Sequence, residues 1–237
     1  MKEIRIREKT PEGQMAEEFK SLRTNILFCG ADKKVLMLTS CTAGEGKSST
    51  SLHLAMSLAD LGKRTLLIDA DLRRSVLLGK LTGSKEKLQG LAHYLSGQTD
   101  LEKIIYATDV PQLHLICSGP FPPNPAELLG AELFRDAVRK LREEYDYVII
   151  DTPPVGMVTD AAIIAQACDG IIMVIGAGDV NYRFAREKKE LLADSGVPVL
   201  GAILNKVDTH GSGYGRYGKY GRYGRYGGYY GSRKEKE

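Results

Sequence analysis

The sequence is poor in cysteine and lacks a long apolar run. Its four cysteines, Cys29, Cys41, Cys117 and Cys168, are far apart, with no Cys-x-x-Cys pair and no histidine at zinc-ligand spacing. We therefore expect no zinc site and reduced, mostly buried thiols. No stretch of about eighteen apolar residues occurs, and the first eight residues carry charges where a signal peptide needs an apolar segment. We expect a cytoplasmic protein that associates with a membrane only through a partner.

Aromatic residues and charges are unevenly placed along the chain. Of the 12 tyrosines, seven lie between Tyr214 and Tyr230. From Gly211 onward, seven Lys/Arg and two Glu give +5, which leaves 26 basic and 28 acidic residues, or −2, for the rest. The basicity therefore belongs to the tail, which argues against a nucleic-acid-binding body. With 43% hydrophobic and 27% charged residues, the chain is typical of a soluble globular protein.

Short apolar runs alternate with helical patterns in the body of the chain. Continuous β-branched runs, rather than alternating ones, indicate strands that are buried on both faces. After an irregular arm over 1–13, the pattern predicts helices at 14–28, 48–61, 126–144, 161–167 and 182–195, and strands at 35–39, 65–68, 113–116, 148–150, 171–175 and 199–204. This alternation predicts a three-layer α/β fold with a mostly parallel, doubly wound sheet. Ligands of such sheets bind at the carboxyl ends of the strands.

Beyond Asp208 the alternation stops, and glycine and tyrosine recur with a period of three residues. No core can form from that composition, so 209–237 is predicted to be disordered. We expect an N-terminal arm and first helix over 1–30, one folded domain over 31–208, and the tail.

A phosphate-binding loop is predicted where the first strand meets the following helix. The segment Thr39-Ser40-Cys41-Thr42-Ala43-Gly44-Glu45-Gly46-Lys47-Ser48 has the glycines, lysine and hydroxyl of a P-loop. Cys41 stands where the general pattern has glycine, and a chance Gly-Lys-Ser in a loop is the alternative reading. The strand and helix on either side favour a P-loop NTPase fold. Residues expected to surround the nucleotide phosphates are Thr42, Ala43, Gly44, Glu45, Gly46, Lys47, Ser48 and Ser49.

Three aspartates follow predicted strands. Asp69 and Asp71 come just after one buried strand, and Asp151 comes after another. Magnesium prefers oxygen ligands, so these carboxylates and the Ser48 hydroxyl are the predicted metal ligands. The alternative is that each aspartate caps a helix or turn. Lys47 is expected at the transferred phosphate.

Either Asp69 or Asp71 is expected to orient or deprotonate an acceptor, and residue pattern does not separate their roles. Arg73 is expected to hold the loop or a neighbouring carboxylate rather than the substrate. Asn205-Lys206-Val207-Asp208 has the form of a base-reading motif found in GTPases. Asn205 is therefore a candidate base contact, but the motif leaves adenine and guanine open.

Taken together, the motifs resemble those of the bacterial tyrosine kinases of the capsule and exopolysaccharide type, the BY-kinases, in the form without a fused membrane domain. The resemblance spans nearly the whole chain. It rests on the P-loop, on Asp-x-Asp-x-Arg at Asp69 to Arg73, on Asp151-Thr152-Pro153-Pro154, on the segment 118–129 and on the tyrosine-rich tail. Each part except the tail also occurs in MinD- and ParA-type proteins.

The resemblance implies an ATP- and Mg²⁺-dependent tyrosine autokinase that regulates capsule or exopolysaccharide synthesis and export. One subunit would phosphorylate the tail of another, on Tyr214, Tyr217, Tyr220, Tyr223, Tyr226, Tyr229 and Tyr230. It also implies a ring, an octamer in the family, formed through Glu17, Lys20 and Arg23, with Lys20 replacing an arginine and losing its planar fork. The implied partners are a membrane adaptor that activates the kinase, a cognate tyrosine phosphatase and further protein substrates.

A rival interpretation is a MinD/ParA-like ATPase switch whose tail is only a binding segment. Gly/Tyr/Arg repeats can stack on bases and bind phosphates, so a nucleic-acid contact of the tail stays open. The loop, however, lacks the extra early lysine of such switches and has Cys41-Thr42 near that place.

Overall fold

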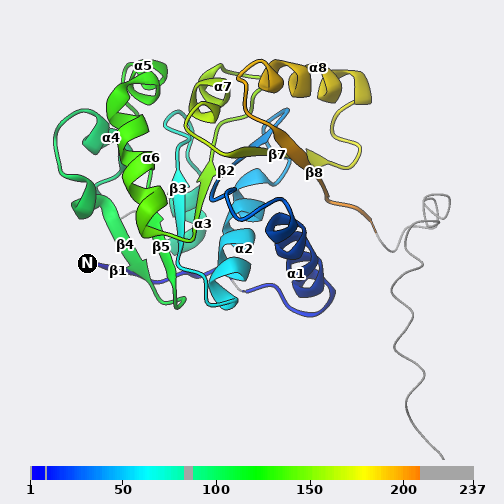
Figure 1. Cartoon of the computed structure of the whole chain (residues 1–237), viewed down its shortest axis with the longest axis horizontal. Helices are drawn as coiled ribbons and strands as arrows, with labels where there is room; N and C mark the ends of the chain where they lie inside the picture. The colour runs from blue at the N-terminus through cyan, green and yellow to red at the C-terminus, as the bar shows by residue number, and fades with distance from the viewer. Residues whose placement is uncertain (1, 9, 83–87, 209–237) are drawn as a thin grey trace, which may run out of the picture. The chain divides into compact units, whose positions relative to one another are not determined.

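A computed structural model describes residues 2–8, 10–82 and 88–208 of the chain (Figure 1). Contacts divide the chain into two units, Met1–Lys206 and Val207–Glu237. The predicted disorder of 209–237 and the seven candidate acceptor tyrosines lie outside the described residues. None of the helices in the described part of the chain has the length and apolarity needed to span a bilayer.

One sheet runs through the first unit (Figure 1). Its strand order is β1-β4-β5-β3-β6-β2-β7-β8, and every neighbouring pair in the described residues is parallel except β4 with β5. The strands are β1 Glu3–Ile4, β2 Val35–Ser40, β3 Thr65–Asp69, β4 Ile105–Thr108, β5 Leu113–Ile116, β6 Tyr147–Asp151, β7 Gly170–Gly176 and β8 Val199–Asn205. The predicted mostly parallel, doubly wound sheet is confirmed.

Helices cover both faces of this sheet. They are α1 Gly13–Phe28, α2 Lys47–Asp60, α3 Leu77–Thr82, α4 Leu91–Leu95, α5 Pro125–Gly130, α6 Glu132–Glu144, α7 Asp160–Ala165 and α8 Tyr182–Ala193, with a 3₁₀ turn η1 at Leu101–Ile104. Side chains alternate along β2, so that Leu36 and Leu38 join a core with α2, whereas Val35 and Met37 join a core with α6 and α7. Two apolar cores on opposite faces make the expected three layers.

The order of the central strands places the candidate residues at one edge. β2, β3 and β6 are buried along their whole length, as continuous apolar runs require. In the parallel register between β3 and β6, Asp69 is the partner of Asp151. The P-loop leaves the carboxyl end of β2, the strand on the other side of β6.

Several boundaries differ from the prediction. A single helix over 126–144 is wrong, because Ala131 is extended, with φ −68° and ψ 152°, and separates α5 from α6. An irregular arm over 1–13 is wrong at Glu3–Ile4, which pairs with β4. β4, α3, α4 and the 3₁₀ turn were not predicted. All four cysteines are free; two are buried, Cys168 is partly buried and Cys29 is exposed.

Candidate active site

The loop between β2 and α2 has the backbone of a phosphate cradle. Gly44 and Gly46 have φ values of +88° and +90°, in the left-handed region that favours glycine. Gly46 also has no room for a side chain, since a Cβ there would lie 2.0 Å from Asn205 Nδ2. Helix α2 begins at Lys47, so its first N–H groups open toward this loop.

Cys41 departs from the glycine of the general motif without distorting the loop. It is not among the positive-φ residues of the described chain, so its backbone does not require glycine. Its side chain is fully buried in the core that contains Met37 and Val155. Burial, and next the charge of Glu45, raise the pKa of the Cys41 thiol to about 11.

The buried Glu45 carboxylate stabilises the loop through hydrogen bonds. It is 1% exposed, and no lysine, arginine or histidine of the described residues forms an ion pair with it. Its Oε1 accepts hydrogen bonds from the Thr42 N–H at 2.5 Å and the Thr42 hydroxyl at 3.0 Å, and its Oε2 accepts one from the Gly176 N–H at 2.9 Å. A buried charge without a counter-ion requires such donors, so Glu45 ties the P-loop to the end of β7.

Asn205, at the end of β8, is also tied to the loop. Its Nδ2 donates to the Glu45 carbonyl oxygen at 2.9 Å. Because that partner is an acceptor, the amide nitrogen must face it, and the orientation of the side chain follows. The amide oxygen is thereby turned away from Glu45.

Lys47 and Asp151 form a buried ion pair at the centre of the site. Lys47 Nζ lies 2.6 Å from Asp151 Oδ1 and 3.2 Å from Ser48 Oγ, and the two charged side chains are 7% and 1% exposed. Ser51, one turn along α2, also donates to Asp151 Oδ1, at 3.1 Å. Ser51 was not predicted as a site residue, although its position four residues after Lys47 puts it on the same helix face.

Asp69 lies beside this pair, and its carboxyl group has a raised pKa. Burial, and next the charge of Asp151, raise its pKa to about 7, although a hydrogen bond from the Ser75 hydroxyl to its Oδ2 acts in the opposite direction. Asp71 is differently held, because its Oδ1 accepts from the N–H groups of Arg73 at 3.3 Å and Arg74 at 2.9 Å.

Arg73 contacts a carboxylate that was not predicted to belong to the site. Its Nε and Nη2 donate to Asp160 Oδ2 and Oδ1 at 2.7 and 2.9 Å, and Asp160 is fully buried. The expectation that Arg73 holds a neighbouring carboxylate is therefore met by the geometry. Asp160 begins α7, and an aspartate at a helix start carries no signal that separates this role from capping.

The oligomer-contact residues predicted on α1 are held within the chain. Lys20 Nζ lies 2.8 Å from Glu17 Oε1, both on exposed positions. Arg23 turns toward α2, where its Nη1 donates to the Ser57 carbonyl at 2.6 Å and lies 3.5 Å from Asp60 Oδ2. Their contact with another subunit stays a prediction.

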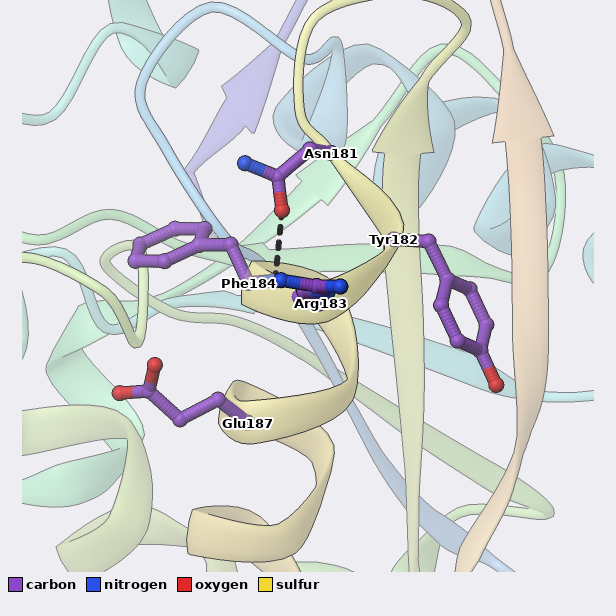
Figure 2. A pocket seen from close by; sticks show the side chains of 5 residues that line it. All are labelled: Asn181, Tyr182, Arg183, Phe184 and Glu187. Carbon is purple, nitrogen blue, oxygen red and sulfur yellow. Dashed lines mark hydrogen bonds between the residues drawn. The ribbon is translucent and has the colours of Figure 1, made fainter.

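A separate open pocket of about 550 Å³ lies at the start of α8 (Figure 2). Its lining residues are Asn181, Tyr182, Arg183, Phe184 and Glu187, and none of them is a predicted site residue. Asn181 Oδ1 accepts from the Phe184 N–H at 2.9 Å, the dashed line in Figure 2, and so caps the helix. The Asn181 side chain therefore stabilises the start of α8.

The candidate site is thus the buried group of Lys47, Ser48, Asp69, Asp71 and Asp151. Across the described ranges, no group of three or more His, Cys, Asp or Glu side chains is arranged to hold a metal ion by itself. Magnesium commonly takes one or two carboxylates and completes its shell with water and phosphate oxygens, so a full protein cage is not required. Ser48 Oγ and Asp151 Oδ1, two of the predicted ligand atoms, both contact the positively charged Lys47 Nζ. Their surroundings therefore favour a positive charge, as a magnesium site requires.

A family model identifies the structural class of the protein. Residues 33–183, more than half of the chain, match the family model described as an AAA domain. With the P-loop between β2 and α2 and a mostly parallel sheet, this match makes the chain a P-loop NTPase by fold.

The nearer relatives define the family. Over 201 residues the chain is 49% identical to the tyrosine-protein kinase CpsD of Streptococcus agalactiae serotype III, covering 84% of this chain and 85% of CpsD. It is 33% identical to the kinase domain of the Escherichia coli tyrosine kinase ETK, with a TM-score of 0.79 over 84% of this chain and 78% of that one. The chain belongs to the bacterial tyrosine-protein kinase family and is a protein-tyrosine kinase.

A more distant likeness concerns the fold alone. The septum site-determining protein MinD of Pyrococcus horikoshii, solved with Mg-ADP, is 21% identical, with a TM-score of 0.60 over 72% of this chain and 69% of MinD. This likeness shows that the chain and MinD share a fold, and it does not support the rival interpretation as an ATPase switch.

Replacing Glu45 with glutamine tests its role beneath the P-loop. Glutamine has one acceptor oxygen where the structure uses two, so a buried N–H of Thr42 or Gly176 would face an amide NH₂. An unsatisfied buried donor costs about 1–3 kcal/mol, which the loop relieves by leaving its phosphate-binding conformation, so we expect the Kd for ATP to rise by roughly tenfold. Titration with a fluorescent ATP analogue measures it, and Thr42→Val, which removes one hydroxyl only, should have a smaller effect. Unchanged affinity in Glu45→Gln would contradict the tie.

Replacing Asp69 with asparagine should stabilise the ligand-free protein. The folded pKa of about 7 exceeds the ordinary 3.8, so ionisation favours the unfolded chain increasingly from about pH 4 to pH 7, and levels off above that. Asparagine removes this effect, which we expect to be on the order of 2–4 kcal/mol at pH 8. Thermal unfolding from pH 4.5 to 8.5 measures the difference, with exposed Asp194→Asn as control. A constant or negative difference would refute the electrostatic cost assigned to Asp69.

Proposed function

We propose that the chain is an autokinase that transfers the γ-phosphoryl group of ATP to tail tyrosines of another copy of itself. The observation that carries this proposal is the convergence of Lys47, Asp69 and Asp151 in one buried site at the carboxyl edge of the sheet. Membership of the tyrosine-kinase family supplies the reaction class, and the tail supplies an acceptor.

The roles of the site residues follow from their positions. Lys47 exchanges its contact with Asp151 for the transferred phosphate, where its charge offsets the charge of the phosphoryl oxygens. Ser48, Asp69, Asp71 and Asp151 would hold Mg²⁺, whose chemistry here is to neutralise phosphate charge. Thr42 to Ser49 bind the phosphates, largely through backbone N–H groups.

Asp69 is the better candidate for the residue that orients or deprotonates the acceptor. The Ser75 hydroxyl already donates to Asp69 Oδ2, which is the kind of contact that an incoming phenol would make. Both aspartates also accept backbone N–H groups on Oδ1, so the distinction rests on this hydroxyl contact and on the pKa of Asp69, which is raised to about 7 by burial and next by the charge of Asp151. A phenol with a pKa near 10 needs such a base near the γ-phosphate.

The tail suits the acceptor role by composition. Its +5 charge before modification favours approach to a centre rich in carboxylate and phosphate. Seven phosphotyrosines at roughly −1.5 to −2 each would make it strongly negative. We propose that this reversal separates neighbouring tails and disassembles the oligomer.

The partners and location complete the proposal. The family resemblance supports an octameric ring through Glu17, Lys20 and Arg23, a membrane adaptor that activates the kinase and recruits it to the membrane from the cytoplasm, and a cognate phosphatase. The cycle would regulate capsule or exopolysaccharide synthesis and export.

The central test is phosphotyrosine formation. The full chain, incubated with ATP, Mg²⁺ and the cytoplasmic segment of its adaptor, should react with an anti-phosphotyrosine antibody. Lys47→Met should lower the signal at least 100-fold, because the ammonium that neutralises phosphate is lost; exposed Lys189→Met is the matched control. A chain truncated after Asp208 should bind ATP but carry no phosphotyrosine. Absence of phosphotyrosine in the intact chain would leave the ATPase-switch reading in its place.

Asn205 is proposed to favour ATP over GTP. With Nδ2 fixed on the Glu45 carbonyl, Asn205 presents its amide oxygen, which can accept from the exocyclic amine of adenine but not from O6 of guanine. Asn205→Ala should weaken ATP binding and reduce the ATP-to-GTP affinity ratio severalfold, as measured by competition against a fluorescent nucleotide. A ratio equal to that of the unmodified chain would remove Asn205 from base selection.

A further inference from the structure

The Arg73–Asp160 ion pair joins two loops that carry different site aspartates. Arg73 lies in the loop after β3, two residues beyond Asp71, and Asp160 begins α7, after the loop that follows Asp151 on β6. The guanidinium makes two hydrogen bonds, at 2.7 and 2.9 Å, one to each carboxylate oxygen. A bidentate contact of this kind fixes orientation as well as distance.

The burial of the pair argues that its value lies in geometry more than in stability. Asp160 is 0% exposed, whereas the Arg73 side chain is 36% exposed. A carboxylate so deeply buried loses its hydration, and the attraction to its partner offsets that cost only in part. An apolar side chain would fill the same space without this cost, so the two hydrogen bonds contribute orientation more than stability.

On one side the pair controls the backbone that holds Asp71. Asp71 Oδ1 accepts from the N–H groups of Arg73 and Arg74, so fixing the Arg73 side chain also fixes the peptide groups that orient this carboxylate. Asp69 is connected to the same turn, because its Oδ1 accepts from the Asp71 N–H at 3.3 Å.

On the other side the pair reaches a segment already attached to the P-loop strand. The Val155 N–H donates to the Ser40 carbonyl at 2.9 Å, and the Gly156 N–H donates to the Cys41 carbonyl at 3.1 Å. The Thr152 hydroxyl adds a bond to the Leu38 carbonyl at 2.9 Å. The segment between Asp151 and Asp160 therefore follows β2 and the start of the P-loop.

We propose that Arg73 and Asp160 are a positioning pair that sets the distance between the Asp69–Asp71 turn and the P-loop. This inference rests on the proposed roles of those aspartates toward magnesium. The pair itself touches neither nucleotide nor acceptor. It affects the part of the ATP affinity that depends on Mg²⁺. The part that comes from the P-loop without Mg²⁺ does not depend on the pair.

The test compares the Kd of a fluorescent ATP analogue in Mg²⁺ and in EDTA, using the full chain. Asp160→Asn and Arg73→Lys should each keep the Kd in EDTA within about twofold, while the tightening by Mg²⁺ falls about tenfold or more in Asp160→Asn. Arg73→Lys keeps the charge but loses the fork, so its loss should be smaller. Arg186→Gln, which breaks an exposed ion pair with Glu190 on α8, is the control and should match the unmodified chain.

Two outcomes overturn the proposal in variants that unfold cooperatively. One is unchanged tightening by Mg²⁺; the other is an equal loss in EDTA, which indicates general damage to the fold. If Asp160→Asn fails to fold, Arg73→Lys decides by the same criterion. Phosphotyrosine on the unmodified chain is measured separately. If the variants lose the tightening by Mg²⁺ but the unmodified chain forms no phosphotyrosine, the positioning role of the pair is supported and the autokinase proposal is refuted.

Discussion

The arrangement of the site depends on the buried contact between Lys47 and Asp151. It joins the first turn of α2 to the end of β6 and places one positive charge near the Asp151 and Asp69 carboxylates. Burial is the main cause that raises the pKa of Asp69, the charge of Asp151 is the next, and the Lys47 ammonium acts in the opposite direction. Lys47 is therefore an internal counter-ion of the site. Under the proposed mechanism, ATP binding exchanges the Asp151 contact of Lys47 for a contact with a phosphate.

Around this contact, the P-loop is held mostly by interactions that use backbone groups. Glu45 bonds to N–H groups of Thr42 and Gly176, and Asn205 bonds to the Glu45 carbonyl. These bonds connect the ends of β7 and β8 to the phosphate cradle. The segments proposed to contact the base and the phosphates are thus connected to each other by hydrogen bonds.

The sequence predicted the central sheet and the position of Asp69 and Asp151 at its carboxyl edge, for a physical reason. Buried parallel strands such as 148–150 are continuous apolar runs, and a polar residue just after one must lie at the carboxyl edge. The prediction failed at Ala131, where nothing local signals that an otherwise helical stretch becomes extended. It also failed at β4, because the pairing of β4 with β5 is decided by tertiary structure and not by local sequence. Asp160 and the Glu45 side chain were missed as structural supports because their partners are 87 and 131 residues away.

Cys41 has a consequence for the chemistry that the loop can withstand. Oxidants and alkylating agents react with thiolates, and a thiol with a pKa of about 11 is almost entirely protonated at neutral pH. The side chain is also inaccessible, with no exposed surface. The cysteine of this loop is thus a poor target for oxidation or alkylation in the folded chain.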